Sequence, residues 1–270
     1  MSIEPGREAS YFVRIRDGVY RPTSHVGGAW DPQEQHFSPV GGLIVHELER
    51  ELSDRLASGM LIGRVSFDIL GRIAHDDIEL TVRTLRPGRT IELVEAVATI
   101  GGRATVSARA WLIASEDTSA VAGTDWTPLP DPETLTTRAM TDTWTGGYIA
   151  SIDAREITPH RPGRAAAWIS TDVPLVAGEQ AGALASFVAL IDTANGIAVR
   201  THPETWMFPN LDLTVHLFRQ PRGRWVGLDT TVSFGPTGQG LTSSRLHDET
   251  GPVGTAEQIL TVRPLPGAAG

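Results

Sequence analysis

A helix is predicted over VGGLIVHELERELSDRL (40–56), and a strand follows it at once over LIGRVSFDIL (61–70). Apolar and polar positions mix at helical spacing in the first segment, and Pro39 just before it suits a first helical turn. Three further β-rich runs come next, separated by turn signals at Pro87-Gly88 and Gly101-Gly102: DIELTVRTL (77–85), TIELVEAVATI (90–100) and ATVSARAWLIA (104–114). The first half therefore predicts one helix and then four strands.

The same order of elements returns in the second half. A helix is predicted from about Gly182 to Val199, and four strands follow over NLDLTVHLF (210–218), WVGLDTTVSF (225–234), GLTSSRLHD (240–248) and GTAEQILTV (254–262). An offset of about 148 residues places VSFDILGR (65–72) against LTVHLFR (213–219), and GGRATVSARAW (101–111) is set against GPVGTAEQILT (251–261). The agreement in order and spacing indicates an internal duplication.

Each copy favours an α+β arrangement in which a long antiparallel sheet wraps around one central helix, because the helix must bury one face and the sheet must cover its concave face. We expect two such sheets, each with its own helix. The predicted divisions are an N-terminal unit over 1–123, a connector rich in Pro, Thr and Asp over 124–164, a C-terminal unit over 165–264 and a frayed tail over 265–270. The alternative is a generic two-domain α+β protein whose halves resemble each other by coincidence.

The composition is that of an ordinary globular protein, with 270 residues, 40% of them apolar and 20% charged. A net charge of -9 gives no electrostatic footprint for nucleic acid or anionic lipid. No apolar run reaches the roughly 18 residues of a membrane span, and MSIEPGREASYF at the start lacks the features of a secretory signal. We expect a cytoplasmic protein with neither nucleic acid nor membrane as a partner.

Several kinds of active site are excluded by the residue types. The absence of cysteine excludes a thiolate nucleophile and a zinc site with Cys ligands. There is no Gly-x-Ser-x-Gly elbow for an acyl-enzyme serine, and His46-Glu47 lacks the second His of a zinc-binding helix. For an enzyme, this leaves attack by water with no metal and no cofactor.

The motifs as a set resemble those of the acyl-CoA thioesterase II-like, or thioesterase-like, double hot-dog family. The matching segments are GGAWDPQEQHFSPVGGLI (27–44), VSFDILGR (65–72), PLVAGEQ (174–180), LIDTANG (190–196), PNLDLTVHLFRQPRGRWVGLD (209–229) and LHDETGPVGTAEQ (246–258). The resemblance implies a tandem hot-dog fold and hydrolysis of an acyl-CoA substrate. A fused pair already supplies the minimal hot-dog dimer, so the oligomeric state stays open, a homo-oligomer included.

The resemblance also implies three catalytic positions. Family enzymes hold the attacking water with an Asp on the second helix, a Thr or similar polar residue at the following strand and a Gln on the last strand. Those positions correspond to Asp192, Asn210 and Gln258, and Asn210 departs from the family's Thr.

The residues themselves leave alternatives open at these positions. Asp192 shares a helix face with apolar side chains, where a desolvated carboxylate becomes a general base; the alternative is an Asp that bonds backbone amides near Gly196. Gln258 points to the apolar face of its strand, where it orients a water or serves as a core Gln bonded to the main chain. Alternation along the strand favours a strand-entry or turn role for Asn210.

The loop before the first helix offers a second chemistry. Asp31 and His36 lie five residues apart, a spacing similar to that of the hydratase branch of hot-dog enzymes, and such a pair could move protons across an enoyl thioester. The other reading is a loop that caps the helix and lines the acyl tunnel with His36. Four aromatic residues are candidates for the tunnel wall, although buried aromatics more often belong to a core: Trp30, Phe37, Trp206 and Phe208. A binding protein that holds acyl thioesters without turnover is the remaining alternative.

Overall fold

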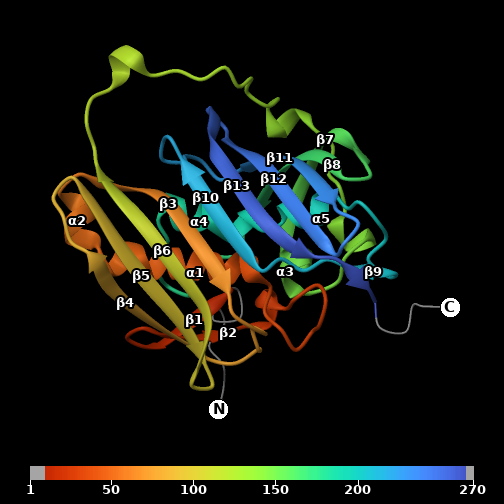
Figure 1. Ribbon diagram of the computed structural model, residues 1–270, viewed down its shortest axis with the longest axis horizontal. Coiled ribbons are helices and arrows are strands. Elements are labelled where there is room, and N and C mark those ends of the chain that lie inside the picture. The colour runs from red at the N-terminus through yellow and green to blue at the C-terminus, as the bar shows by residue number, and fades with distance from the viewer. Residues whose placement is uncertain (1–9, 266–270) are drawn as a thin grey trace.

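The computed structural model describes residues 10–265, and twelve of its strands form one antiparallel sheet (Figure 1). The first half contributes β1 (Phe12–Arg16), β2 (Val19–Pro22), β3 (Met60–Ile69), β4 (Ile78–Arg86), β5 (Ile91–Ile100) and β6 (Arg103–Ala114). The second half contributes β7 (Ile152–Arg161), β8 (Arg164–Thr171), β10 (Asp212–Leu217), β11 (Val226–Phe234), β12 (Gln239–Asp248) and β13 (Gly251–Thr261). A separate two-stranded pair joins β9 (Trp206–Met207) to β14 (Arg263–Pro264).

The strand order is that of a duplicated unit. It runs β1-β2-β4-β5-β6-β3-β10-β13-β12-β11-β8-β7. From the β1 edge inward the order ends in β4, β5, β6 and β3, and from the β7 edge inward it ends in their counterparts β11, β12, β13 and β10. The starts of β4 and β11, of β5 and β12, and of β6 and β13 are each 148 residues apart (78 to 226, 91 to 239, 103 to 251). The predicted offset is confirmed. The last strand differs from the predicted alignment: Gly251 corresponds to Arg103 rather than to Gly101, because Gly101 and Gly102 form the turn that precedes β6.

The two sheets expected from the sequence are joined into one. β3 pairs with β10 in antiparallel register from Asp68↔Asp212 to Arg64↔His216. Without this pairing each half would end in a row of unpaired backbone N–H and C=O groups. The duplicated halves therefore share a continuous backbone hydrogen-bond network across their junction.

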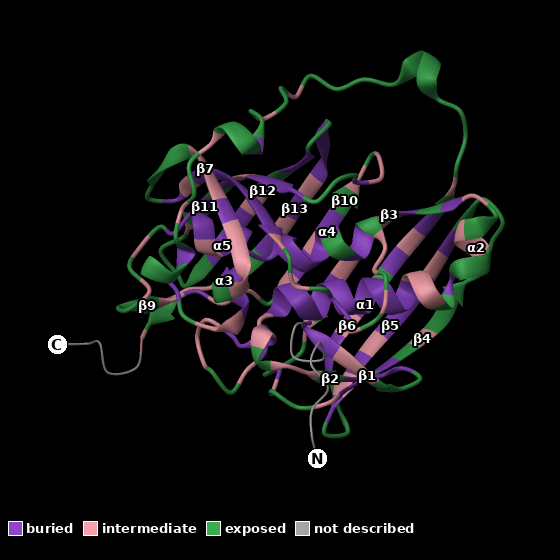
Figure 2. Cartoon of the chain, turned by 180° about the vertical axis from the view of Figure 1, so that it is seen from behind, coloured by how far each residue is buried: buried purple, intermediate pink, exposed green. Residues whose placement is uncertain are grey.

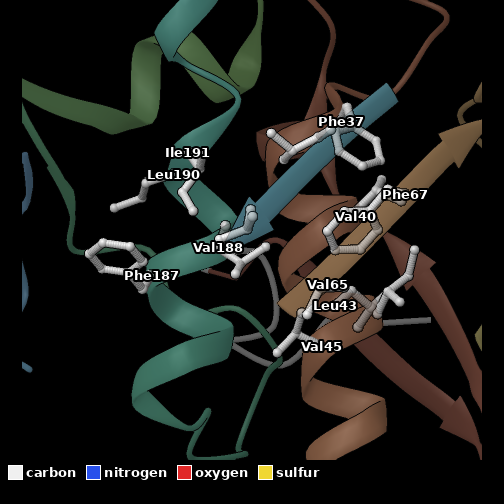
Figure 3. Packing of buried hydrophobic residues seen from close by; sticks show 14 of the residues in the cluster. Phe37, Val40, Leu43, Val45, Val65, Phe67, Phe187, Val188, Leu190 and Ile191 are labelled. Carbon is white, nitrogen blue, oxygen red and sulfur yellow. The ribbon is translucent and has the colours of Figure 1, made fainter. Parts of the chain in front are cut away.

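The central helices α1 (Phe37–Glu51) and α4 (Ala183–Ile191) lie next to each other against the same face of the sheet, as the view from behind shows (Figure 2). Apolar side chains of both helices meet each other and β3 in one core, labelled in Figure 3. The helices approach closely at Gly42, where an added Cβ would lie 2.5 Å from the Cβ of Ala189. Glycine is therefore required at this contact.

Both central helices differ in length from the predictions. The first begins at Phe37 and ends at Glu51, and a separate short helix, α2 (Ser53–Ala57), follows it. The second ends at Ile191, and a further turn of helix, α5 (Ala194–Ile197), starts after Asp192 and Thr193. Asp and Thr are weak helix formers because their side chains restrict or compete with the helical backbone. The break places Asp192 at a helix end rather than within a helix.

The predicted connector over 124–164 holds regular structure in its second part. A short helix, α3 (Gly147–Ser151), leads directly into β7, which pairs with β8 at the edge of the sheet. The predicted domain limits stay a prediction, and residues 266–270 of the predicted tail lie outside the described residues. Within 10–265, the helices are too short or too polar to cross a bilayer.

Candidate active site

Asp192 lies where the second central helix ends, and its side chain meets two amide groups. Asn210 Nδ2 donates to Asp192 Oδ1 at 2.9 Å, and Gln258 Nε2 donates to the same oxygen at 2.5 Å. The carboxylate is only 7% exposed. Its other oxygen, Oδ2, accepts no hydrogen bond from residues 10–265. The protein therefore holds Oδ1 through two hydrogen bonds, and Oδ2 remains available to accept a proton.

The two amides reach Asp192 from different strands. Gln258 comes from the middle of β13, with its side chain on the buried face. Asn210 precedes β10, bridges to Leu260 and also donates to the main-chain oxygen of Asp212 at 3.1 Å. It is thus a strand-entry residue, as alternation indicates, whose amide nevertheless points to the carboxylate.

These contacts differ from the structural alternatives considered for Asp192 and Gln258. Asp192 bonds two side-chain amides rather than backbone amides near Gly196. Gln258 bonds the carboxylate rather than the main chain, and its own Oε1 is buried without a partner among the described residues. An unpaired buried acceptor costs about 1–3 kcal/mol. Packing alone therefore does not explain the choice of glutamine here.

Burial changes the acidity of the carboxyl group. Removal from water raises the pKa of Asp192 to about 7, and the hydrogen bonds from Asn210 and Gln258 oppose that rise by stabilising the charged form. A carboxylate with a pKa near neutrality accepts a proton far more readily than an exposed aspartate. Asp192 is thus suited to work as a general base.

A cavity of about 440 Å³ opens directly beside Asp192. Its lining includes Asn210, His36, Phe37 and Trp30 from the predicted set. The lining is mixed in character, because Glu34, Arg72, Asn195 and Arg263 add polar groups to the aromatic and aliphatic wall. Gln258 is not part of the lining and contributes to the site through its hydrogen bond to Asp192.

The aromatic candidates separate into three groups. Trp30 and Phe37 line the cavity. Phe208 is fully buried behind the wall, with its ring centroid 5.2 Å from that of Trp30. Trp206 is 39% exposed on β9 and is not part of the lining. The expected place of Trp206 in the tunnel wall is therefore wrong, because the short β9–β14 pair holds it at the surface.

The structure does not join Asp31 to His36. Asp31 Oδ1 accepts from the main-chain N–H of Gln33 at 2.8 Å, and Oδ2 accepts from Arg72 Nη2 at 2.7 Å. His36 instead lies beside Asp192, with Nδ1 3.6 Å from Asp192 Oδ2. The Asp31 carboxylate is occupied by a turn and an ion pair, so the predicted proton-transfer pair is absent.

Two contributions to the site come from the predicted connector and were not anticipated. Trp144 lines the cavity, donates from Nε1 to the main-chain oxygen of Gly196 at 3.0 Å and packs against Trp30 with ring centroids 4.9 Å apart. Tyr148 of α3 stacks on His36 at 4.2 Å between centroids. The sequence signal was limited to aromatic residues in a segment otherwise rich in polar residues and Pro, which also contains Trp126.

Two models of known protein families match this chain. A model of the acyl-CoA thioesterase N-terminal domain matches residues 26–113, and a model of the C-terminal domain of the same enzymes matches residues 116–262. The chain belongs to the acyl-CoA thioesterase family. It is accordingly a thioester hydrolase, and the family resemblance seen in its motifs is confirmed.

Solved structures agree on the fold. A hot-dog protein of unknown function from Alicyclobacillus acidocaldarius superposes with a TM-score of 0.73 at 10% identity, covering 97% of this chain and 99% of that one. An acyl-CoA thioesterase II from Mycobacterium marinum gives 0.67 at 16% identity, with 97% and 99% covered. At such low identity the likeness establishes the hot-dog fold alone. No curated protein matches the thioesterase chain in sequence.

Proposed function

We propose that this thioesterase hydrolyses a fatty acyl-CoA by attack of a water molecule that Asp192 deprotonates. The observation that carries the proposal is the convergence of two amide donors on one oxygen of a buried carboxylate, which leaves the second oxygen beside a cavity. The two amides fix the orientation of Asp192. Its raised pKa lets it take a proton near neutral pH.

The proposed reaction needs no group beyond those present in the site and the water. The water oxygen bonds to the thioester carbonyl carbon while its proton passes to Asp192 Oδ2. The tetrahedral intermediate then loses the C–S bond, and the departing sulfur takes the proton from Asp192. The products are a fatty acid and free CoA. Trp30 and Phe37 form part of the wall for the acyl chain, and Phe208 supports Trp30 from behind.

One assay separates this proposal from its alternatives. Purified protein is given a series of straight-chain acyl-CoAs of increasing length, and free thiol is measured; hydration of an enoyl-CoA is measured in parallel. The proposal predicts thiol release that depends on Asp192. Saturable binding without thiol release would instead identify a binding protein, and hydration of the enoyl-CoA would identify a hydratase. The cytoplasmic location, the oligomeric state and the absence of nucleic-acid and membrane partners stay predictions.

A further inference from the structure

The His36 side chain has one ring nitrogen engaged in its own helix. It is the N-cap of α1, and its Nδ1 accepts a hydrogen bond from the main-chain N–H of Ser38 at 3.1 Å. A neutral imidazole carries its proton on one nitrogen only. Because Nδ1 is the acceptor, the proton of the neutral ring is on Nε2.

The ring is neutral at physiological pH. Burial lowers the pKa of His36 to about 3, because removal from bulk water disfavours the charged form. The separation of 3.6 Å between His36 Nδ1 and Asp192 Oδ2 is therefore not an ion pair. This matters for Asp192, since a neighbouring positive charge would lower its pKa and make it a weaker base.

The ring is also held in one orientation. It stacks on Tyr148 with an interplanar angle of 30°, and Tyr148 is itself anchored by a hydrogen bond of 2.6 Å between its hydroxyl and Thr193 Oγ1. His36 lines the cavity beside Asp192. Within residues 10–265, no group accepts a hydrogen bond from Nε2. A fixed N–H donor is thus available next to the proposed base.

We propose that His36 is a catalytic residue whose Nε2–H donates a hydrogen bond to the thioester carbonyl oxygen as negative charge develops on it. The inference rests on the proposed hydrolysis. When water adds to the carbonyl carbon, the electron pair of the C=O bond moves to oxygen, and His36 stabilises that oxygen without giving up its proton. When the C–S bond breaks, the electron pair returns and the hydrogen bond weakens.

A neutral imidazole suits this role better than a charged one. It remains a donor across the pH range in which Asp192 loses its proton, so the two groups are in their working forms together. A fixed donor acts without reorganisation at the moment of reaction. Loss of one such donor lowers kcat by roughly 10²- to 10³-fold in other acyl-transfer enzymes.

Two amide variants distinguish catalysis from helix capping. The side-chain oxygen of Asn can replace Nδ1 as the cap acceptor, but Asn offers no donor at the Nε2 position. The longer Gln side chain can place an N–H near the Nε2 position and gives up the cap. We expect His36→Asn to keep its folding and KM while kcat falls roughly 10²-fold. We expect His36→Gln to keep more of the kcat than His36→Asn, although it is less stable.

The outcomes distinguish a failure of the proposed hydrolysis from a failure of the role proposed for His36. If the wild type releases no thiol from any acyl-CoA, the proposed function fails before His36 is tested. If the wild type is active and folded His36→Asn keeps its kcat, the role of His36 is refuted, and a cap function alone remains. Should neither variant fold, ¹⁵N NMR of the wild type decides: a neutral Nε2–H ring for His36 at neutral pH is the expected result. A charged ring or an Nδ1–H tautomer would overturn the inference.

Discussion

Replacement of Asp192 with Asn tests the proposed base in two independent ways, because the charge of a buried carboxylate affects stability as well as catalysis. Asn has nearly the shape of Asp, and its Oδ1 can accept the hydrogen bonds that Asn210 and Gln258 donate to Asp192 Oδ1. The exchange therefore removes the negative charge and preserves the packing around it.

The stability of the protein should increase on this exchange, by an amount that depends on pH. The pKa of Asp192 is raised from an ordinary 3.8 to about 7, so deprotonation favours the unfolded chain. The wild type then loses stability as the pH rises from about 4 to about 7 and loses no more above that. The difference between the two pKa values corresponds to about 4 kcal/mol, which the Asn variant does not lose. We expect its melting temperature at about pH 8 to exceed that of the wild type by roughly 5–15 °C.

The activity should change in the opposite direction. An amide cannot accept the proton of the attacking water, and a positioned general base contributes roughly 10²- to 10⁴-fold to the rate. We expect kcat for thiol release from acyl-CoA to fall by that factor. The matched control is Asp31→Asn, which removes an equal charge from an exposed loop where Asp31 pairs with Arg72. The control should keep its kcat.

Thermal unfolding of both variants at about pH 5 and about pH 8, together with thiol release, gives all of these quantities. Two results would contradict the reasoning. Near wild-type turnover by Asp192→Asn would show that another group activates the water. A stability difference that stayed the same at both pH values would show that Asp192 is not protonated in this range, and the argument from burial would fail.

Three further predictions concern the surroundings of Asp192. Gln258→Leu removes a hydrogen bond that favours the charged carboxylate, so the midpoint of the pH–rate profile should move above its wild-type value near 7. Arg263 lines the cavity, and within residues 10–265 its side chain bonds only Thr261 Oγ1, so we expect the guanidinium to pair with a phosphate of CoA. Arg263→Ala should then raise KM roughly 3- to 5-fold for acyl-CoA and leave KM unchanged for a truncated, phosphate-free thioester. Trp144→Leu should enlarge the cavity, so the ratio of kcat/KM for long over short acyl chains should rise, as measured across the acyl-CoA series.

The sequence predicts the strands of this fold well and their assembly less well. Residues 78–86 and 91–100 alternate clearly, and turns at Pro87-Gly88 and Gly101-Gly102 set their limits. The pairing of β3 with β10 joins segments about 150 residues apart, and no local pattern reports which edges meet. The sequence does not predict the break of the second helix after Ile191, because apolar residues continue at helical spacing beyond it, at Ala194 and Ile197.

In the candidate site, the sequence indicates individual residues better than the contacts between residues far apart in the chain. The family resemblance implies Asp192 and Gln258 as site residues, and the structure brings their side chains into contact. Alternation indicates the strand-entry position of Asn210, and β10 does begin just after it at Asp212, but alternation does not report that the amide points to Asp192. Tyr148 escaped notice because its segment has the composition of a linker. Its contact with His36 spans more than a hundred residues and depends on the tertiary fold.

Duplication explains why the chain can tolerate a destabilising group in its core. At an offset of 148 residues, the three polar side chains of the site correspond to buried apolar residues of the first half: Ile44 for Asp192, Ile62 for Asn210 and Ala110 for Gln258. At the position of Asp192, α1 therefore carries no carboxylate; the carboxylate that α1 does bury, Glu47, is held by Tyr20 and Arg50, and its pKa is lowered rather than raised. A second buried carboxylate, with its pKa raised as far as that of Asp192, would lower the free energy of unfolding above pH 7 by about 4 kcal/mol more. That is a large share of the 5–15 kcal/mol typical of a folded protein. At these three positions the first half thus supplies apolar core side chains, and the second half supplies the reactive carboxylate and the two amides that hold it.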